Sequence, residues 1–90
     1  MSEENNESII EYPCAFPIKI MGHTQIGFAQ AVLAVVARHA PDFDGATMEM
    51  KTSTQGKYLS VTCTINATSR KQLDALYCEL CDHPMVVMVL

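Results

Sequence analysis

Two cysteines and a histidine near the end of the chain have a spacing that could bind a metal ion. Cys78 and Cys81 form a Cys-x-x-Cys pair, and His83 follows two residues later. If the fold brought His23 to the same end of the molecule, these four side chains could supply ligands to zinc. Both cysteines fall late in a predicted helix, however, where the macrodipole disfavours a thiolate, whereas redox-active pairs lie at helix starts. We therefore expect free thiols, no bound metal and no cofactor.

A second stretch, from Gly22 to Phe28, could surround an anion with backbone amides. Its pattern faintly resembles the phosphate-binding loop of acylphosphatases, which need an arginine just after the loop and an asparagine to orient water. Here Ala29 and Gln30 stand where the arginine would fall, and the next basic residue is Arg38. Because no paired carboxylates and no nucleophile with a base are recognisable elsewhere, we expect the chain not to be an enzyme.

The second half of the chain shows which elements must position these residues. From Tyr58 to Asn66, apolar residues alternate with mostly hydroxyl-bearing ones, which predicts a strand with one buried face. Ser69, with Gln72 three residues later, matches a capping box at the start of a helix. The buried stripe of that helix follows the i, i+3, i+4, i+7 spacing and consists of Leu73, Leu76, Tyr77 and Leu80.

The first half of the chain repeats this order of elements. Residues 16–21 alternate as a first strand that ends at Gly22, and Pro17 should lie near the start of that strand or at a bulge. Thr24 is the predicted cap of a helix that ends before Pro41. The buried stripe expected for this helix is Ile26, Ala29, Val32, Leu33 and Val36.

Two further strands complete the pattern. Residues 47–51 alternate as a second strand, residues 52–56 form a hairpin loop, and residues 85–90 form a short apolar last strand. Met48, Met50 and Met88 are interpreted as core fillers. The order strand, helix, strand, strand, helix, strand predicts an α+β ferredoxin-like fold, βαββαβ. We expect a four-stranded antiparallel sheet, with the first and third strands central and both helices on one face.

The distribution of charge separates a tail from a domain. Glu3, Glu4, Glu7 and Glu11 precede the first basic residue, and the remaining six acids balance six Lys and Arg, so the net charge of −4 belongs to the tail. We predict a disordered acidic tail over residues 1–11 and one domain over residues 12–90. A near-neutral domain lacks the basic stripe that binds a phosphate backbone, so we expect no nucleic-acid partner.

The chain has no apolar segment long enough for a membrane span and no signal-peptide pattern, so we expect a cytoplasmic protein that does not bind membranes. The four cysteines fit reduced thiols in that compartment. The last predicted strand is a sheet edge without any charged residue, whereas the second carries Glu49 and Lys51 outward. We therefore expect self-association or a protein partner, through the fourth-strand edge or the open sheet face.

Several segments together resemble the YbeD-like family of small bacterial proteins. They are spread along nearly the whole chain outside the tail, at residues 12–14, 17–22, 38–41, 53–60, 65–68 and 88–90. The resemblance implies a ferredoxin-like fold similar to ACT-type regulatory domains, which bind amino acids at dimer interfaces. The family has no established activity, although some of its members are encoded near lipoate-attachment genes.

If the ACT similarity extends to function, the ligand lies at the loop after the first strand, at Gly22, His23 and Thr24. Glycine lets a backbone approach a ligand, and amides at a helix start favour a carboxylate.

Two hypotheses about the function of the chain follow. The first is a non-catalytic regulatory or adaptor module that acts through protein association. The alternative is a sensor of a small anionic metabolite such as an amino acid, connected with lipoate metabolism.

Overall fold

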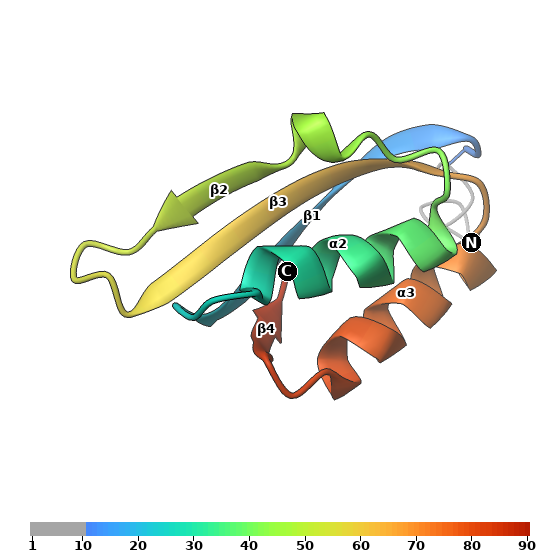
Figure 1. The fold of residues 1–90 in the computed structure, drawn as a ribbon. Helices are drawn as coiled ribbons and strands as arrows, with labels where there is room; N and C mark the ends of the chain where they lie inside the picture. The colour runs from blue at the N-terminus through green and yellow to red at the C-terminus, as the bar shows by residue number, and fades with distance from the viewer. Residues whose placement is uncertain (1–10) are drawn as a thin grey trace, which may run out of the picture.

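The computed structural model describes residues 11–90 as two helices packed on a four-stranded sheet (Figure 1). In chain order, the elements are β1 (Cys14–His23), α2 (Phe28–His39), a 3-10 turn (Gly45–Thr47), β2 (Glu49–Thr52), β3 (Tyr58–Ala67), α3 (Arg70–Asp82) and β4 (Val86–Val89). The predicted tail, apart from Glu11, lies outside the described residues. Neither helix among the described residues is long and apolar enough to cross a membrane.

The sheet has the order and direction that the sequence predicts. Its strands run β2-β3-β1-β4, and every neighbouring pair is antiparallel. β1 and β3 pair over ten residues, from Cys14 opposite Ala67 to His23 opposite Tyr58. Both helices cover the same face of the sheet (Figure 1). The ferredoxin-like βαββαβ fold with central β1 and β3 is therefore confirmed.

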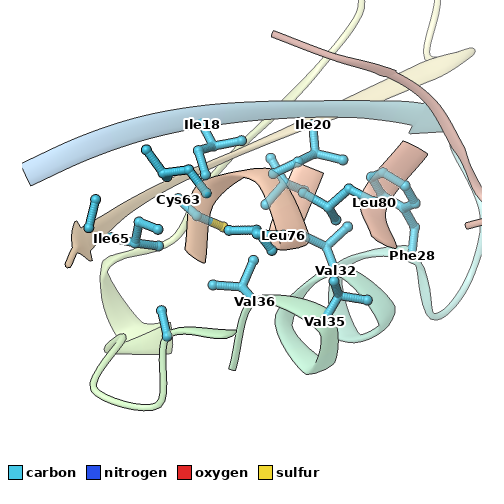
Figure 2. Packing of buried hydrophobic residues seen from close by; sticks show 14 residues of the cluster. Ile18, Ile20, Phe28, Val32, Val35, Val36, Cys63, Ile65, Leu76 and Leu80 are labelled. Carbon is cyan, nitrogen blue, oxygen red and sulfur yellow. The ribbon is translucent and has the colours of Figure 1, made fainter. Parts of the chain in front are cut away.

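The core lies between the helices and the covered face of the sheet. Figure 2 shows side chains from β1, β3, α2 and α3 pointing toward one another in this layer. The largest side chains in it are almost completely inaccessible to solvent: Phe28, Ile18, Ile20, Ile65, Leu76 and Leu80. Burial at this scale contributes roughly 1.5–3 kcal/mol per large side chain, which holds the two layers together.

Pro17 lies inside β1 without disturbing the sheet. Lys19 exchanges both backbone hydrogen bonds with Leu90, at 3.2 and 2.8 Å, so the backbone of Pro17 also faces the β4 side. No described residue pairs with Pro17 on that side, because the described β4 partners of β1 lie opposite Ile20, Met21 and Gly22. The missing N–H of Pro17 therefore costs no ladder bond, and the proline is tolerated early in a central strand.

The first helix starts later than its pattern suggests. α2 begins at Phe28, and its N-cap is Gly27 in the left-handed region at φ 89°, not Thr24. A left-handed φ, which glycine adopts readily, is not helical, so the chain is still turning at Gly27. The side chain of Ile26 therefore falls outside the helical stripe and is fully exposed. Val32 and Val36 are buried as predicted.

Two of the three methionines assigned to the core lie elsewhere. Met48 packs against the core. Met50 on β2 is about half exposed because neither helix covers that edge of the sheet, and Met88 on β4 is about half exposed because its pairing with Met21 places it on the face away from the helices. Their side chains are thus available at the surface.

The start of α3 matches its prediction. Ser69 is the N-cap, and its hydroxyl accepts a hydrogen bond from the Gln72 backbone N–H at 3.0 Å. The Gln72 side chain in turn accepts from the backbone N–H of Thr68 at 2.7 Å, one residue before the position expected in a capping box. Two amides at the start of the helix are satisfied in this way.

Candidate functional site

The loop proposed for ligand binding is held by its neighbours in the fold. Gly22 is buried, and a Cβ atom placed there would collide with the Met85 carbonyl oxygen and the Phe28 ring. The space beside this glycine is therefore filled by protein atoms. The backbone N–H of Thr24 donates to the carbonyl of Lys57 at 2.9 Å, which joins the loop to the start of β3.

His23 and Thr24 are exposed, and His23 belongs to the open face of the sheet. Its ring lies 5.0 Å from the ring of Tyr58, measured between centroids. The two residues are paired across β1 and β3, so their side chains share one face, and alternation with the buried Ile20 and Val61 makes this the face away from the helices. His23 thus sits on the opposite side of the sheet from α2, whereas the resemblance implied a ligand shared by this loop and the helix start.

The cysteines and histidines near the end of α3 do not form a cluster with His23. Cys78 and Cys81 are exposed free thiols, and the Nδ1 atom of His83 accepts a hydrogen bond from the Met85 N–H at 3.1 Å. His23 lies across the sheet from α3. Among the described residues, no three His, Cys, Asp or Glu side chains gather as metal ligands.

Two groups have pKa values raised by burial. Burial raises the pKa of the Cys63 thiol to about 11, so this thiol is held neutral in the core. Burial also raises the pKa of Tyr77, with a smaller contribution from the negative charge that Cys81 would carry. The Tyr77 hydroxyl donates to the carbonyl of Leu90 at 3.3 Å.

A polar bridge between α2 and α3 was not recognised from the sequence. The Glu79 carboxylate contacts both Arg38 and His39, with 2.7 Å between its Oε1 atom and His39 Nε2. The Gln72 amide donates to the His39 carbonyl at 2.7 Å. These partners lie 33 to 41 residues apart in the chain, so no local pattern signals them. The bridge joins the two helices and is not open to a substrate from the sheet side.

The open sheet face presents a regular array of side chains, which follows from strand register. Lys19, Thr62 and Glu49 lie in one row across β1, β3 and β2. Met21, Ser60 and Lys51 form the next row, with Met88 of β4 beside Met21. His23 and Tyr58 form the third row. Neither helix covers this face (Figure 1).

Two shallow hollows lie on this face. One of about 410 Å³ is lined by Lys19, Glu49, Met50, Lys51, Ser60 and Thr62. The other, of about 180 Å³, is lined by Met21, Lys51, Thr52, Ser53, Thr54, Tyr58 and Ser60. Lysine ammonium groups and hydroxyls dominate both linings, so the face suits anionic groups better than cationic ones.

The edge of β4 is the second exposed feature. Val86–Val89 pairs with β1 on one side only, and no described strand pairs with its other side. Val87 and Met88 are 52% and 48% exposed. An uncharged strand edge of this kind offers unpaired backbone groups together with apolar side chains.

These features define a small ferredoxin-like domain whose exposed sheet surfaces, and not an enclosed pocket, are its candidate site. The chain belongs to the family described as "Protein of unknown function (DUF493)", whose model matches residues 7–90. This agrees with the YbeD-like resemblance noted above, and the relatives below are bacterial.

Two relatives show how far the similarity extends. The UPF0250 protein NE1487 of Nitrosomonas europaea is 64% identical, over 93% of this chain and 97% of that protein. A UPF0250 protein of Bordetella pertussis is 54% identical, over 93% of this chain and 92% of that protein. The similarity thus covers almost the whole chain and almost the whole of each relative.

Solved structures share the fold at low sequence identity. The solution structure of protein HP0495 from Helicobacter pylori has a TM-score of 0.73 at 18% identity, covering 90% of this chain and 85% of that one. The ACT domain from the GTP pyrophosphokinase of Chlorobium tepidum has a TM-score of 0.64 at 18% identity, covering 84% and 81%. At this identity, the comparisons show an ACT-like fold.

Proposed function

We propose that this chain is a non-catalytic regulatory or adaptor module that works in the cytoplasm by protein association, and that a second copy is its first partner. The observation that carries the proposal is the exposed, uncharged β4 edge. Its exposed residues include Val87 and Met88, whereas β2 at the opposite edge carries the exposed charges of Glu49 and Lys51. Charged edges resist strand pairing, so the contrast singles out β4 as the associating edge.

The strand geometry supports this choice. Two copies related by a twofold axis could pair their β4 strands antiparallel and join two sheets into one. Directly after β4, the Leu90 carbonyl accepts hydrogen bonds from the Lys19 N–H on the β1 side and from the Tyr77 hydroxyl, which fixes the end of the strand. A fixed edge loses little conformational freedom on pairing.

Sedimentation velocity at several concentrations tests the proposal. The natural chain should form a dimer, and Val87→Lys should shift it to a monomer because a lysine opposes edge pairing. Met50→Lys is the matched control, since it adds the same charge at a similarly exposed position on β2, and it should leave the dimer intact. A natural chain that stays monomeric at every concentration would contradict self-association.

A sensor of a small anionic metabolite, such as an amino acid or a lipoyl compound, is the second candidate. Its support is local: His23 and Thr24 are exposed, and the Thr24 to Lys57 hydrogen bond brings a basic residue next to them. A ligand at about a hundred times its Kd would add nearly 3 kcal/mol to the free energy of unfolding. A thermal-shift screen against these compounds should show a rise of several degrees that His23→Ala abolishes.

A further inference from the structure

A groove of about 300 Å³ lies between the first half of β1 and the helix α3. Its lining consists of Tyr12, Phe16, Arg70, Leu73, Asp74 and Tyr77. The four residues from α3 follow the i, i+3, i+4, i+7 spacing, so one stripe of that helix forms a wall of the groove. Three aromatic rings and a leucine make the lining mainly apolar, while the side chains of Arg70 and Asp74 are exposed to solvent. The groove therefore suits an apolar side chain.

The groove continues the line of β4 along β1. Leu90 lies opposite Lys19, and its carbonyl accepts a hydrogen bond from Tyr77, which also lines the groove. Farther toward the start of β1, the backbone groups of Pro17 and Ala15 point to the same side as those of Lys19. No described residue pairs with Ala15 or Pro17 on that side. The N–H of Ala15 and the carbonyls of both residues can therefore pair with one more short strand.

The chain itself supplies an apolar segment directly before the groove. Tyr12 lines the groove, and the backbone bends at Tyr12 and Pro13. Ile9 and Ile10 precede Tyr12 by three and two residues, so their Cα atoms are at most about 11 and 7 Å from that of Tyr12. A connection this short gives the segment an effective concentration at the groove of about millimolar or more, which favours it over a separate molecule.

The family match begins at the same segment. It covers residues 7–90, so it includes Ile9 and Ile10 and leaves out residues 1–6, where Glu3 and Glu4 lie. This boundary supports assigning residues 7–10 to the domain. It would shorten the tail predicted from charge to residues 1–6.

We infer that residues 8–10 add a short strand to β1 and that the side chain of Ile9 fills the groove. A four-residue connection, a common length for a hairpin loop, pairs Ile10 with Ala15 and places Ile9 opposite Phe16. Phe16 lines the groove, so Ile9 points toward the groove and Ile10 toward the open face of the sheet. This inference goes beyond the proposed association, which was assigned to the β4 edge, and does not rest on it.

NMR spectroscopy of the full chain labelled with ¹³C and ¹⁵N tests the inference. NOE cross-peaks should connect the methyl groups of Ile9 with the rings of Phe16 and Tyr77. The Ile10 methyl groups should show no such cross-peaks, because that side chain lies on the other face of the added strand. These contacts should appear within one chain and should not depend on protein concentration.

Hydrogen exchange gives a second measurement on the same sample. The Ala15 amide should be protected, because it donates to the carbonyl of Ile10 in the added strand. Ile9→Thr keeps the branched shape that strands favour but removes apolar burial, so it should speed exchange at Ala15 by about fivefold or more. Ile10→Thr is the matched control and should change this rate less than about twofold, since its side chain does not enter the groove.

Other results would overturn the inference. Absence of Ile9 cross-peaks together with rapid exchange at Ala15 would show that this segment is not the occupant and would leave the groove to a strand of another protein. A larger effect of Ile10→Thr than of Ile9→Thr would contradict the pairing of Ile9 with Phe16. Cross-peaks found only between labelled and unlabelled chains would place the segment in the groove of a second copy. If the natural chain stays monomeric while the Ile9 contacts appear, the association function fails and this inference stands.

Discussion

The carboxylate of Glu79 on α3 lies 2.7 Å from the Nε2 atom of His39 at the end of α2. The same carboxylate contacts Arg38, so one side chain on α3 joins that helix to the last turn of α2. Partial burial of the bridge limits water access to it, which makes it stronger than an exposed ion pair.

Removing Glu79 should therefore destabilise the packing of the two helices. We expect Glu79→Ala to lower the free energy of unfolding by about 1 kcal/mol, because solvent still screens the partly exposed partners. Urea denaturation measures the change. Asp74→Ala is the control, since its contact with Arg70 is 3.9 Å long and largely exposed, and it should cost under about 0.5 kcal/mol. Equal losses in both variants would contradict a special role for Glu79.

Gly22 should not tolerate a side chain. In Gly22→Ala the new methyl group would meet the Met85 carbonyl and the Phe28 ring, and neither can move without disturbing the β4 connection or the core. We expect a loss of roughly 3 kcal/mol in the free energy of unfolding. Gly56→Ala is the comparison: it has a φ of 75° but no neighbour within 4 Å, so it should cost about 1 kcal/mol from backbone strain alone. A neutral Gly22→Ala would reopen the case for ligand approach at this residue.

The two predicted helix caps should respond differently to alanine. Ser69→Ala removes the hydroxyl that accepts the Gln72 N–H and should cost about 1 kcal/mol of stability. Thr24→Ala should change stability by less than about 0.5 kcal/mol, because α2 begins only at Phe28. Thermal unfolding of both variants measures the two losses of stability and shows which residue caps its helix. A cost at Thr24 equal to that at Ser69 would show that the helix starts earlier than described.

The sequence predicts the fold well because each element carries a clear local period. The alternation from Tyr58 to Asn66 and the spacing from Leu73 to Leu80 determine which face each element buries. The start of α2 escaped prediction because Ile26 fits the helical spacing by chance, and only the backbone shows the left-handed φ of Gly27.

The candidate surfaces depend on pairings that no local pattern reveals. Lys19 and Lys51 come to line one hollow of the open face only through the register of β1, β3 and β2. The contact of His39 with Glu79 likewise links positions 40 residues apart. The charged sheet face therefore could not be predicted from a composition that is close to neutral for the domain as a whole.

Cys63 should be an unreactive thiol that makes stability depend on alkaline pH. Burial raises its pKa to about 11 from an ordinary value of 9.0, so the folded state holds the proton more tightly than the unfolded state does. Stability from this group is therefore complete below about pH 9 and is lost as pH rises toward 11. Urea denaturation at several pH values should show this decline in stability, and Cys63→Ala should reduce the decline.

At about pH 8, alkylation followed by mass spectrometry should label the exposed Cys78 and Cys81 and spare Cys63 until urea is added. Rapid labelling of Cys63 in the folded chain would contradict its burial between the sheet and the helices.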